Sequence, residues 1–335
     1  MKLIVSTSAI CTAWIAIVIA IALAPTSSLP ISVSAMVVLP NNSRDAAMEA
    51  TYDRLAKQAT DLYHSGKGTG LGGRCWIGIA GGPGAGKSTL AAAVADRICE
   101  LEAKPGSSKN SNIQAVAVPM DGYHYTRAKL ASVTQALGDS DNDDGTKGMS
   151  RRGAPWTFDA NALARDLGAA KALGRASLPE YDRVLSDPVD DAVVVEESHQ
   201  IVLVEGNYLI LGLLTEEVEP TGNTNTPLPT SKLEKACDDL LCPIPIGDEI
   251  RRWRDVAALW DETWFVAPPG INAVKIQRDR IIERSLETWN PSKTKAWNGK
   301  TDREAAIKRA EFNDIRNARL VECCRGYADL VVDSI

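Results

Sequence analysis

Residues 81–88 have the residue types and spacing of a phosphate-binding loop. They match the pattern G-x-x-x-x-G-K-[ST], whose glycines let backbone amides approach phosphate oxygens without an intervening Cβ. The nucleotide-binding residues predicted from the pattern are Gly81, Gly82, Pro83, Gly84, Ala85, Gly86, Lys87, Ser88 and Thr89. Lys87 is predicted to be catalytic by bridging the β- and γ-phosphates, and Ser88 to ligate Mg²⁺. The loop therefore predicts binding of a nucleoside triphosphate.

The sequences on either side of the loop support this interpretation. Residues 76–79 form a short apolar run typical of a buried strand. After the loop, Leu90, Val94 and Ile98 recur at helical spacing until Pro105 ends the run. A glycine-rich turn with an incidental lysine would not require a strand before it and a helix after it.

Acidic residues follow two further predicted strands. The apolar run 113–120 precedes Asp121, and the run 201–204 precedes Glu205. Open α/β sheets bind ligands beyond the carboxyl ends of their strands, so both acids are expected at the edge that binds the nucleotide. The alternative for each acid is a turn residue, because each precedes a glycine.

Strands and helices alternate along the rest of the chain. Predicted helices cover residues 48–62, 160–173, 253–260, 273–288 and 301–313, and predicted strands cover 193–195, 263–267 and 328–332. Asp159 is expected to cap the second of these helices, and Thr301 with Glu304 to form a capping box for the last. This alternation predicts a three-layer α/β fold of the P-loop NTPase type, with a mainly parallel central sheet.

Composition and charge limit the function classes. The chain has 335 residues, of which 44% are hydrophobic and 24% charged, as in an ordinary globular protein. Its formal net charge of −6 argues against a nucleic-acid partner, which would favour a basic surface. The seven cysteines show no paired C-x-x-C spacing, so neither a zinc site nor a disulfide framework is predicted.

The N-terminus differs from the rest of the chain. Residues 3–24 are apolar and nearly uncharged, and Lys2 is the only charged residue before Arg44. This pattern predicts a signal peptide or membrane anchor within residues 1–35, with membrane contact only through residues 3–24 if the segment is not cleaved. It implies targeting to the ER or another organelle, whereas a mis-assigned start codon would leave a cytoplasmic protein.

Residues 46–335 are predicted to form a single P-loop domain after a linker at 36–45. Two polar inserts are expected within it, near 138–149 and 215–247. The first is acidic but does not fit a calcium loop, because an EF-hand requires Gly and Glu at positions where this segment has other residues. We therefore interpret the first as a solvated loop and the second as a peripheral insertion.

Four segments, GGPGAGKST, PMDGYH, RRGAPWTFD with LPEYDR, and LVEGNYL, occur in this order. Together they resemble the phosphoribulokinase, uridine kinase and pantothenate kinase superfamily of P-loop kinases. The resemblance covers about residues 46–333 and is greatest to a branch of bacterial and fungal predicted kinases that share the second and third phrases. The first segment alone is generic, whereas the ordered set is specific.

The resemblance implies roles for residues around the loop. Asp121 matches the acid that orients or deprotonates the acceptor hydroxyl and can contact Mg²⁺, and Glu205 matches a Mg²⁺-binding carboxylate. Substrate-binding roles are implied for His124, Arg151, Arg152, Tyr181 and Asp182, and a lid role for Arg278, Arg280 and Arg284. Each of these side chains also has a structural alternative, such as a core tyrosine or a solvated arginine.

These observations predict an ATP- and Mg²⁺-dependent kinase that phosphorylates a hydroxyl of a small metabolite. A nucleoside, a sugar or sugar acid, and a pantothenate-like alcohol are all compatible, and a homodimer is left open. The alternative is a nucleotide-dependent switch or assembly factor without an acceptor pocket. A GTPase switch would be expected to carry an N-K-x-D base-recognition phrase, which the sequence lacks.

Overall fold

The computed structural model describes residues 42–102, 113–136, 148–214, 246–270 and 272–334. All of them belong to one unit, Asn41–Ile335. The predicted signal peptide or anchor and nearly all of both predicted inserts lie outside the described residues. In the part of the chain that is described, no helix combines the length and apolar character needed to cross a bilayer.

Five parallel strands form the central sheet. In spatial order they are β2 (Gln114–Pro119), β5 (His199–Gly206), β1 (Cys75–Ala80), β6 (Glu262–Ala267) and β7 (Leu330–Asp333). Parallel neighbours require crossover connections, which helices provide on both faces of such a sheet. The predicted α/β fold with a mainly parallel central sheet is confirmed.

Side-chain alternation along the strands creates a core on each face of the sheet. In β1, Cys75, Ile77 and Ile79 contribute to one core and Trp76 and Ala80 to the other, and all are buried. Central strands of a parallel sheet are covered on both faces, which explains their nearly continuous apolar sequences.

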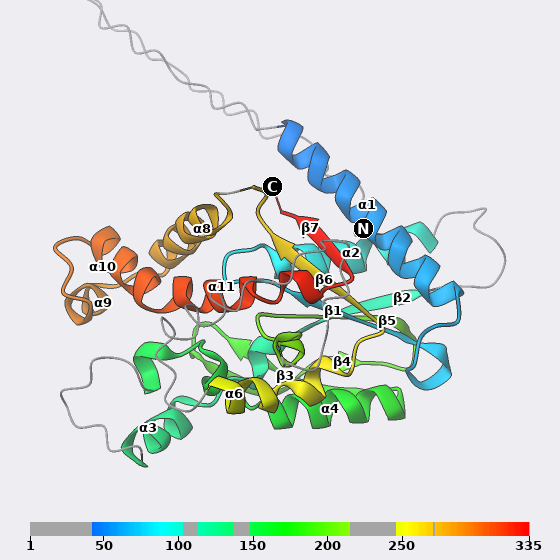
Figure 1. Cartoon of the computed structure of the whole chain (residues 1–335), viewed down its shortest axis with the longest axis horizontal. Helices are drawn as coiled ribbons and strands as arrows, with labels where there is room; N and C mark the ends of the chain where they lie inside the picture. Colours follow the sequence, from blue (N-terminus) through cyan, green and yellow to red (C-terminus); the bar gives the residue numbers. More distant parts are fainter. Residues whose placement is uncertain (1–41, 103–112, 137–147, 215–245, 271, 335) are drawn as a thin grey trace, which may run out of the picture. The chain divides into compact units, whose positions relative to one another are not determined.

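Helices cover both faces of the sheet (Figure 1). On the first face, α1 (Asn42–His64) contributes Leu55, and α2 (Lys87–Glu102) contributes Val94, to the core with Ile77. On the second face, α4 (Ala160–Leu173) contributes Leu163 to the core with Trp76. The predicted cap of α4 is present, since the Ala162 amide donates to Asp159 at 2.9 Å.

The remaining helices are α3 (Arg127–Ala136), α6 (Ile246–Arg252), α7 (Arg254–Ala257), α8 (Ala273–Glu287), α9 (Pro291–Ala296), α10 (Asp302–Arg309) and α11 (Ile315–Glu322). The predicted helix at 253–260 is wrong in extent, because α7 ends at Ala257 and the Asp261 amide then donates to Trp76 O at 2.8 Å. The predicted helix at 301–313 instead passes through a π-helical turn at 310–314 and continues as α11.

A β-hairpin that the sequence analysis did not identify lies beside the sheet. It consists of β3 (Ala176–Asp182) paired antiparallel with β4 (Asp187–Val195). Several of its residues are exposed, and a proline interrupts β3, so neither strand shows the continuous apolar pattern of the central strands. The hairpin contributes to the functional site described below.

Asp261 joins three parts of the fold and is 1% exposed at its side chain. Its carboxylate accepts from the Trp76 amide at 2.8 Å and from Lys171 Nζ at 3.2 Å, and also binds Thr69. We expect Asp261→Ala to lower the free energy of unfolding by about 3–5 kcal/mol, because it removes the acidic partner of the Lys171 ammonium, which is only 15% exposed, and the acceptor of the Trp76 amide. The measurement is urea unfolding, with exposed Asp190→Ala, expected within about 0.5 kcal/mol of the parent, as control. Equal stability of the two variants would contradict this assignment.

Candidate active site

Strand register brings the predicted site residues to one edge of the sheet. Glu205 on β5 is paired with Ile79 on β1 and with Pro119 on β2. The phosphate loop starts two residues after Ile79, and Asp121 follows two residues after Pro119. Because parallel strands end at the same edge, the loop and both acids lie around a common position.

The phosphate loop connects β1 to α2, whose first residue is Lys87. Gly84 and Gly86 have φ angles of 74° and 92°, a region that favours glycine. A Cβ on Gly84 would also lie 2.7 Å from the Gln277 carbonyl oxygen of α8. The loop is therefore shaped by both its own backbone and its contact with α8, and its amides precede a helix N-terminus suited to an anion.

The Lys87 ammonium is buried at the start of α2. Its Nζ donates to Asn207 Oδ1 at 2.8 Å and to the Gly82 carbonyl at 3.2 Å. Burial lowers the pKa of Lys87, while Glu205 and Asp121 act in the opposite direction. Sequence reasoning did not assign Asn207, although its position two residues after Glu205 was a usable signal.

Ser88 and Glu205 form the second part of the site. Ser88 Oγ donates to Glu205 Oε1 at 2.7 Å, and burial raises the pKa of Glu205 against the opposing effect of Lys87. The described residues contain no cluster of three or more His, Cys, Asp or Glu side chains suited to a metal. A hydroxyl with one buried carboxylate nevertheless fits Mg²⁺, which commonly takes one or two protein carboxylates together with substrate phosphates.

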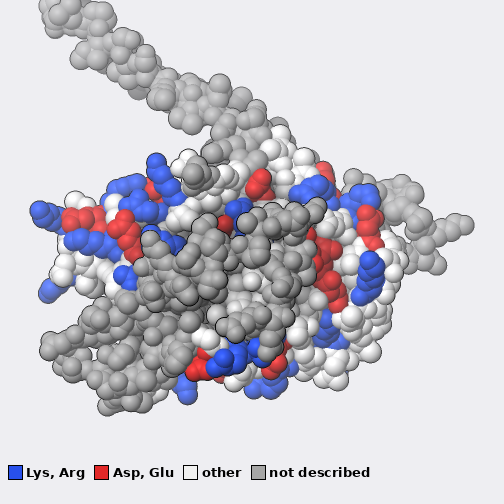
Figure 2. All heavy atoms as spheres, viewed as in Figure 1, with Lys and Arg blue, Asp and Glu red and all other residues white. Residues whose placement is uncertain are grey.

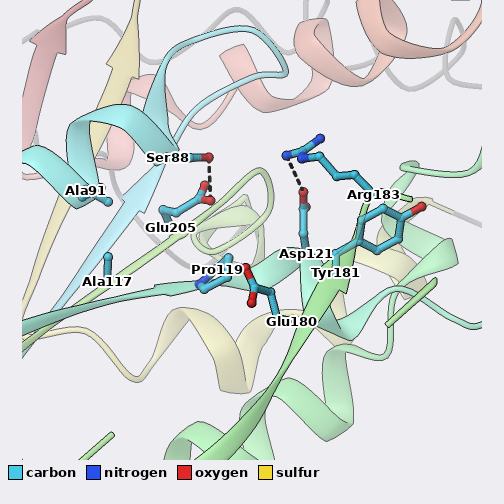
Figure 3. A pocket seen from close by; sticks show the side chains of 10 residues that line it. Ser88, Ala91, Ala117, Pro119, Asp121, Glu180, Tyr181, Arg183 and Glu205 are labelled. Carbon is cyan, nitrogen blue, oxygen red and sulfur yellow. Dashed lines mark hydrogen bonds and ion pairs between the residues drawn. The ribbon is translucent and has the colours of Figure 1, made fainter. Parts of the chain in front are cut away.

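A cleft of about 270 Å³ extends from this pair. It is lined by Ser88, Ala91, Ala92, Ala117, Pro119, Asp121, Glu180, Tyr181, Arg183 and Glu205. Figure 3 shows the Ser88–Glu205 pair on one side, with Asp121 and Arg183 on the other. The predicted residues Asp121, Glu205, Ser88 and Tyr181 are thus brought together, and Glu180 and Arg183 are additions from the hairpin.

His124 lies behind the cleft rather than in its lining. Its Nδ1 is 2.8 Å from the Asp121 carbonyl oxygen, and its ring packs against Phe158 and Tyr181 at centroid distances of 3.9 and 4.9 Å. His124 is partly buried and does not line the cleft, so its contact with substrate stays a prediction. The contact of the His124 ring with the Asp121 carbonyl stabilises the turn that carries Asp121.

Arg151 and Arg152, which were also predicted to bind substrate, do not line the cleft either. Arg151 is fully buried and donates to Asn313 Oδ1 at 3.0 Å and to the Phe312 carbonyl at 2.7 Å. Arg152 donates to Asp187 Oδ1 at 2.9 Å and lies over the Tyr181 ring. Arg151 therefore ties its loop to the turn before α11, and Arg152 holds the hairpin.

Asp182 also has a different position from the one expected. Its Oδ1 accepts from the amides of Val184 at 2.7 Å and Leu185 at 2.9 Å, so the carboxylate stabilises the hairpin turn. The neighbouring Arg183, not Asp182, lines the cleft.

The structure separates the three predicted lid arginines on α8. Arg278 pairs with Glu311 at 2.7 Å, and Arg280 donates to Ser334 Oγ at 3.2 Å. Arg284 is exposed and close enough to Lys87 for its charge to lower the pKa of that lysine, although burial and two acidic residues have larger effects. Figure 2 shows basic and acidic side chains interspersed at the left of the view, where Figure 1 places α8, α9 and α10.

The buried His124 predicts a pH dependence of stability. Burial lowers its pKa below the ordinary 6.5, and Asp121 opposes this, while Arg152 and Arg183 lower it further. Below about pH 6.5 the unfolded chain therefore binds more protons than the folded protein, so the free energy of unfolding should decrease as the pH is lowered. The stability associated with neutral His124 is fully present above about pH 6.5 and is lost as the pH falls through the folded-state pKa.

Urea unfolding of the parent and His124→Gln from about pH 5 to pH 8 checks this expectation. The variant should show a shallower loss of stability at acid pH, whereas exposed His64→Gln should follow the parent. Identical pH profiles for the parent and His124→Gln would rule out the contribution.

Three comparisons with known proteins bear on this site. No family model matches the chain. A protein of Schizosaccharomyces pombe named "Putative uridine kinase C227.14" is 34% identical over 169 residues, which cover 50% of this chain and 62% of that protein. The match thus spans less than two thirds of the relative.

Solved structures give the same picture of the fold. A "putative fructose transport system kinase" from Silicibacter sp. TM1040 is 25% identical, with a TM-score of 0.51 over 77% of this chain and 89% of that one. YFH7 from Saccharomyces cerevisiae, described as "a putative P-loop containing kinase with a circular permutation", is 15% identical, with a TM-score of 0.52 over 84% of this chain and 98% of that one. The P-loop kinase fold and the resemblance to this kinase superfamily are confirmed.

Proposed function

We propose that this protein, which has the fold of the P-loop kinases, is an ATP-dependent kinase that phosphorylates a hydroxyl group of a small metabolite. The observation that supports this best is the single cleft. The phosphate loop and the Ser88–Glu205 pair border one side of it, and Asp121 borders the other. This arrangement leaves room for an acceptor between the γ-phosphate position and a carboxylate.

The proposed mechanism relies on alignment and charge neutralisation, because phosphoryl transfer requires little covalent participation by protein. Lys87 and the loop amides would hold the phosphates of ATP. Ser88 and Glu205 would hold Mg²⁺, which neutralises charge on the phosphate oxygens when bound. Asp121 would orient the acceptor hydroxyl and accept its proton as the oxygen attacks in line.

Arg284 is the proposed lid residue on α8. It is exposed and near Lys87, whereas Arg278 and Arg280 have the other partners described above. A guanidinium close to the transferred group would stabilise the charge on its oxygens in the transition state.

The alternative of a nucleotide-dependent switch is less well supported by the geometry. A switch requires phosphate contacts but no room for an acceptor. Here the cleft continues past the phosphate loop to Asp121, Glu180 and Tyr181. A cleft that joins an anion cradle to polar side chains from a separate hairpin fits a two-substrate enzyme.

Asp121→Asn tests the proposed base. We expect kcat to fall by roughly 10²–10⁴-fold with the dissociation constant for ATP nearly unchanged, because the amide keeps the shape but does not accept the proton. The measurement is transfer from labelled ATP by the full chain to a panel of nucleosides, sugars, glycerate and pantothenate. Exposed Asp255→Asn is the matched control and should retain full activity. Undiminished transfer by Asp121→Asn would remove the proposed base.

Lys87→Ala should weaken both ATP binding and phosphoryl transfer. Loss of the ammonium removes a charge-assisted contact to the phosphates, so ATP binding should weaken about 10- to 100-fold in addition to the loss of transfer. Calorimetric titration with a non-hydrolysable ATP analogue separates the two effects. Unchanged affinity would show that Lys87 does not contact the nucleotide.

Arg284→Ala and Arg278→Ala form a matched pair on the same helix. We expect Arg284→Ala to lower kcat by about 10³-fold, in the range of an arginine that stabilises the transferred group. Arg278→Ala should have little effect, since this side chain pairs with Glu311. Steady-state kinetics of both variants tests the assignment, and the reverse order of effects would contradict it.

A further inference from the structure

The hairpin turn directs one arginine toward the acceptor end of the cleft. We propose that Arg183 binds an anionic group of the acceptor, so that the substrate is an alcohol that also carries a carboxylate or phosphate. This inference rests on the proposed kinase function and specifies the substrate class of the same cleft.

The backbone around Arg183 is held on both sides. Before it, Asp182 accepts from the amides of Val184 and Leu185 and fixes the turn. After it, the Ser186 carbonyl accepts from Arg152 at 2.7 Å, and Asp187 pairs with the same guanidinium at 2.9 Å. The turn that presents Arg183 is therefore anchored by contacts that do not involve its own side chain.

The Arg183 side chain itself remains available. It is 67% exposed, and its guanidinium lies 4.0 Å from Asp121 Oδ2, beyond ordinary hydrogen-bond distance. Figure 3 shows its guanidinium beside Asp121, on the side of the cleft opposite Ser88 and Glu205. In the described part of the chain its N–H groups donate no hydrogen bond, in contrast to those of Arg152. A guanidinium presents five donors in a planar fork that matches carboxylate and phosphate oxygens.

The charges around the cleft favour this role. Asp121, Glu180 and Glu205 line it, and Arg183 is the one basic residue among the described lining residues. Lys87 and a bound Mg²⁺ would offset the charge of Glu205. Asp121 and Glu180 would still repel an anionic acceptor unless a further cation offset them, whereas an uncharged acceptor would not need one. Binding of the acceptor's anion would also take Arg183 away from Asp121 and leave that carboxylate to the hydroxyl.

The other lining groups suit the remainder of such a molecule. Ala92, Ala117 and Pro119 present small apolar surfaces against which a short carbon chain can pack. Glu180 is exposed on the hairpin and, as a carboxylate, only accepts hydrogen bonds. It therefore suits a further hydroxyl of the acceptor and not the anion.

The first experiment compares anionic alcohols with their neutral counterparts. The full chain is incubated with ATP and Mg²⁺ and with glycerate or glycerol, gluconate or glucose, pantothenate or panthenol, and glycerol 3-phosphate or glycerol. Product formation is followed by mass spectrometry. We expect kcat/KM to be about 10- to 100-fold higher for the anionic member of the pair that is used best, and the two kinds of pair distinguish a carboxylate from a phosphate.

The second experiment assigns the preference to one side chain. With the preferred acceptor, Arg183→Gln should raise KM for that acceptor about 10- to 100-fold with little change in KM for ATP, and Arg183→Lys should restore part of the loss. The preference for the anionic member over the neutral one should decrease by a similar factor in Arg183→Gln. Arg175→Gln, at an exposed arginine outside the cleft lining, is the control and should match the parent.

The outcomes separate the inference from the function on which it rests. Transfer to neutral alcohols in preference to anionic ones would overturn the inference and leave the kinase function intact. A rise in KM for ATP alone in Arg183→Gln would also overturn it, because the arginine would then serve the nucleotide. Absence of transfer to every one of these acceptors, and to the nucleosides of the panel used for Asp121→Asn, would overturn the proposed function and the inference with it.

Discussion

Parallel strand pairing is the constraint on which the site depends. The register aligns Ile79, Glu205 and Pro119 across three adjacent strands, so the segments that follow them emerge at one edge. Neither the phosphate loop nor Asp121 needs a specific contact with the other to be brought near Glu205. A shift of β5 by one residue would turn Glu205 to the opposite face of the sheet and separate it from Ser88. The hydrophobic cores on both faces oppose such a shift, and thereby keep the polar groups in position.

The same edge contains charges that the surrounding protein groups do not fully stabilise. Burial lowers the pKa of Lys87 and raises that of Glu205, so each charged form is disfavoured despite the proximity of the other. A bound triphosphate with its cation would supply partners to both groups. Asn207 completes this arrangement by holding the ammonium at 2.8 Å. Perturbed titration of this kind is common where binding, rather than stability, determines the choice of residues.

Local patterns in the sequence predicted the central strands, the phosphate loop and the cap of α4, because each depends on neighbours within a few residues. The hairpin and the side-chain orientations were less accessible. Arg151 is buried because it binds Asn313, which is more than 150 residues away in sequence. Arginine is usually exposed, so the residue type alone did not predict this position. The sequence analysis named Asp182 as a substrate residue, whereas the structure places Asp182 at the hairpin turn and its neighbour Arg183 in the cleft lining. This difference arose because a turn-stabilising aspartate and a substrate-binding one have the same residue type.

The most direct test of the central claim is a crystal structure with Mn²⁺ and a non-hydrolysable ATP analogue, in which anomalous scattering locates the metal. We expect the metal beside Ser88 Oγ and the Glu205 carboxylate at roughly 2.0–2.2 Å, with Asp121 facing the γ-phosphate across the cleft. A metal bound away from both side chains, or a γ-phosphate pointing away from Asp121, would contradict it.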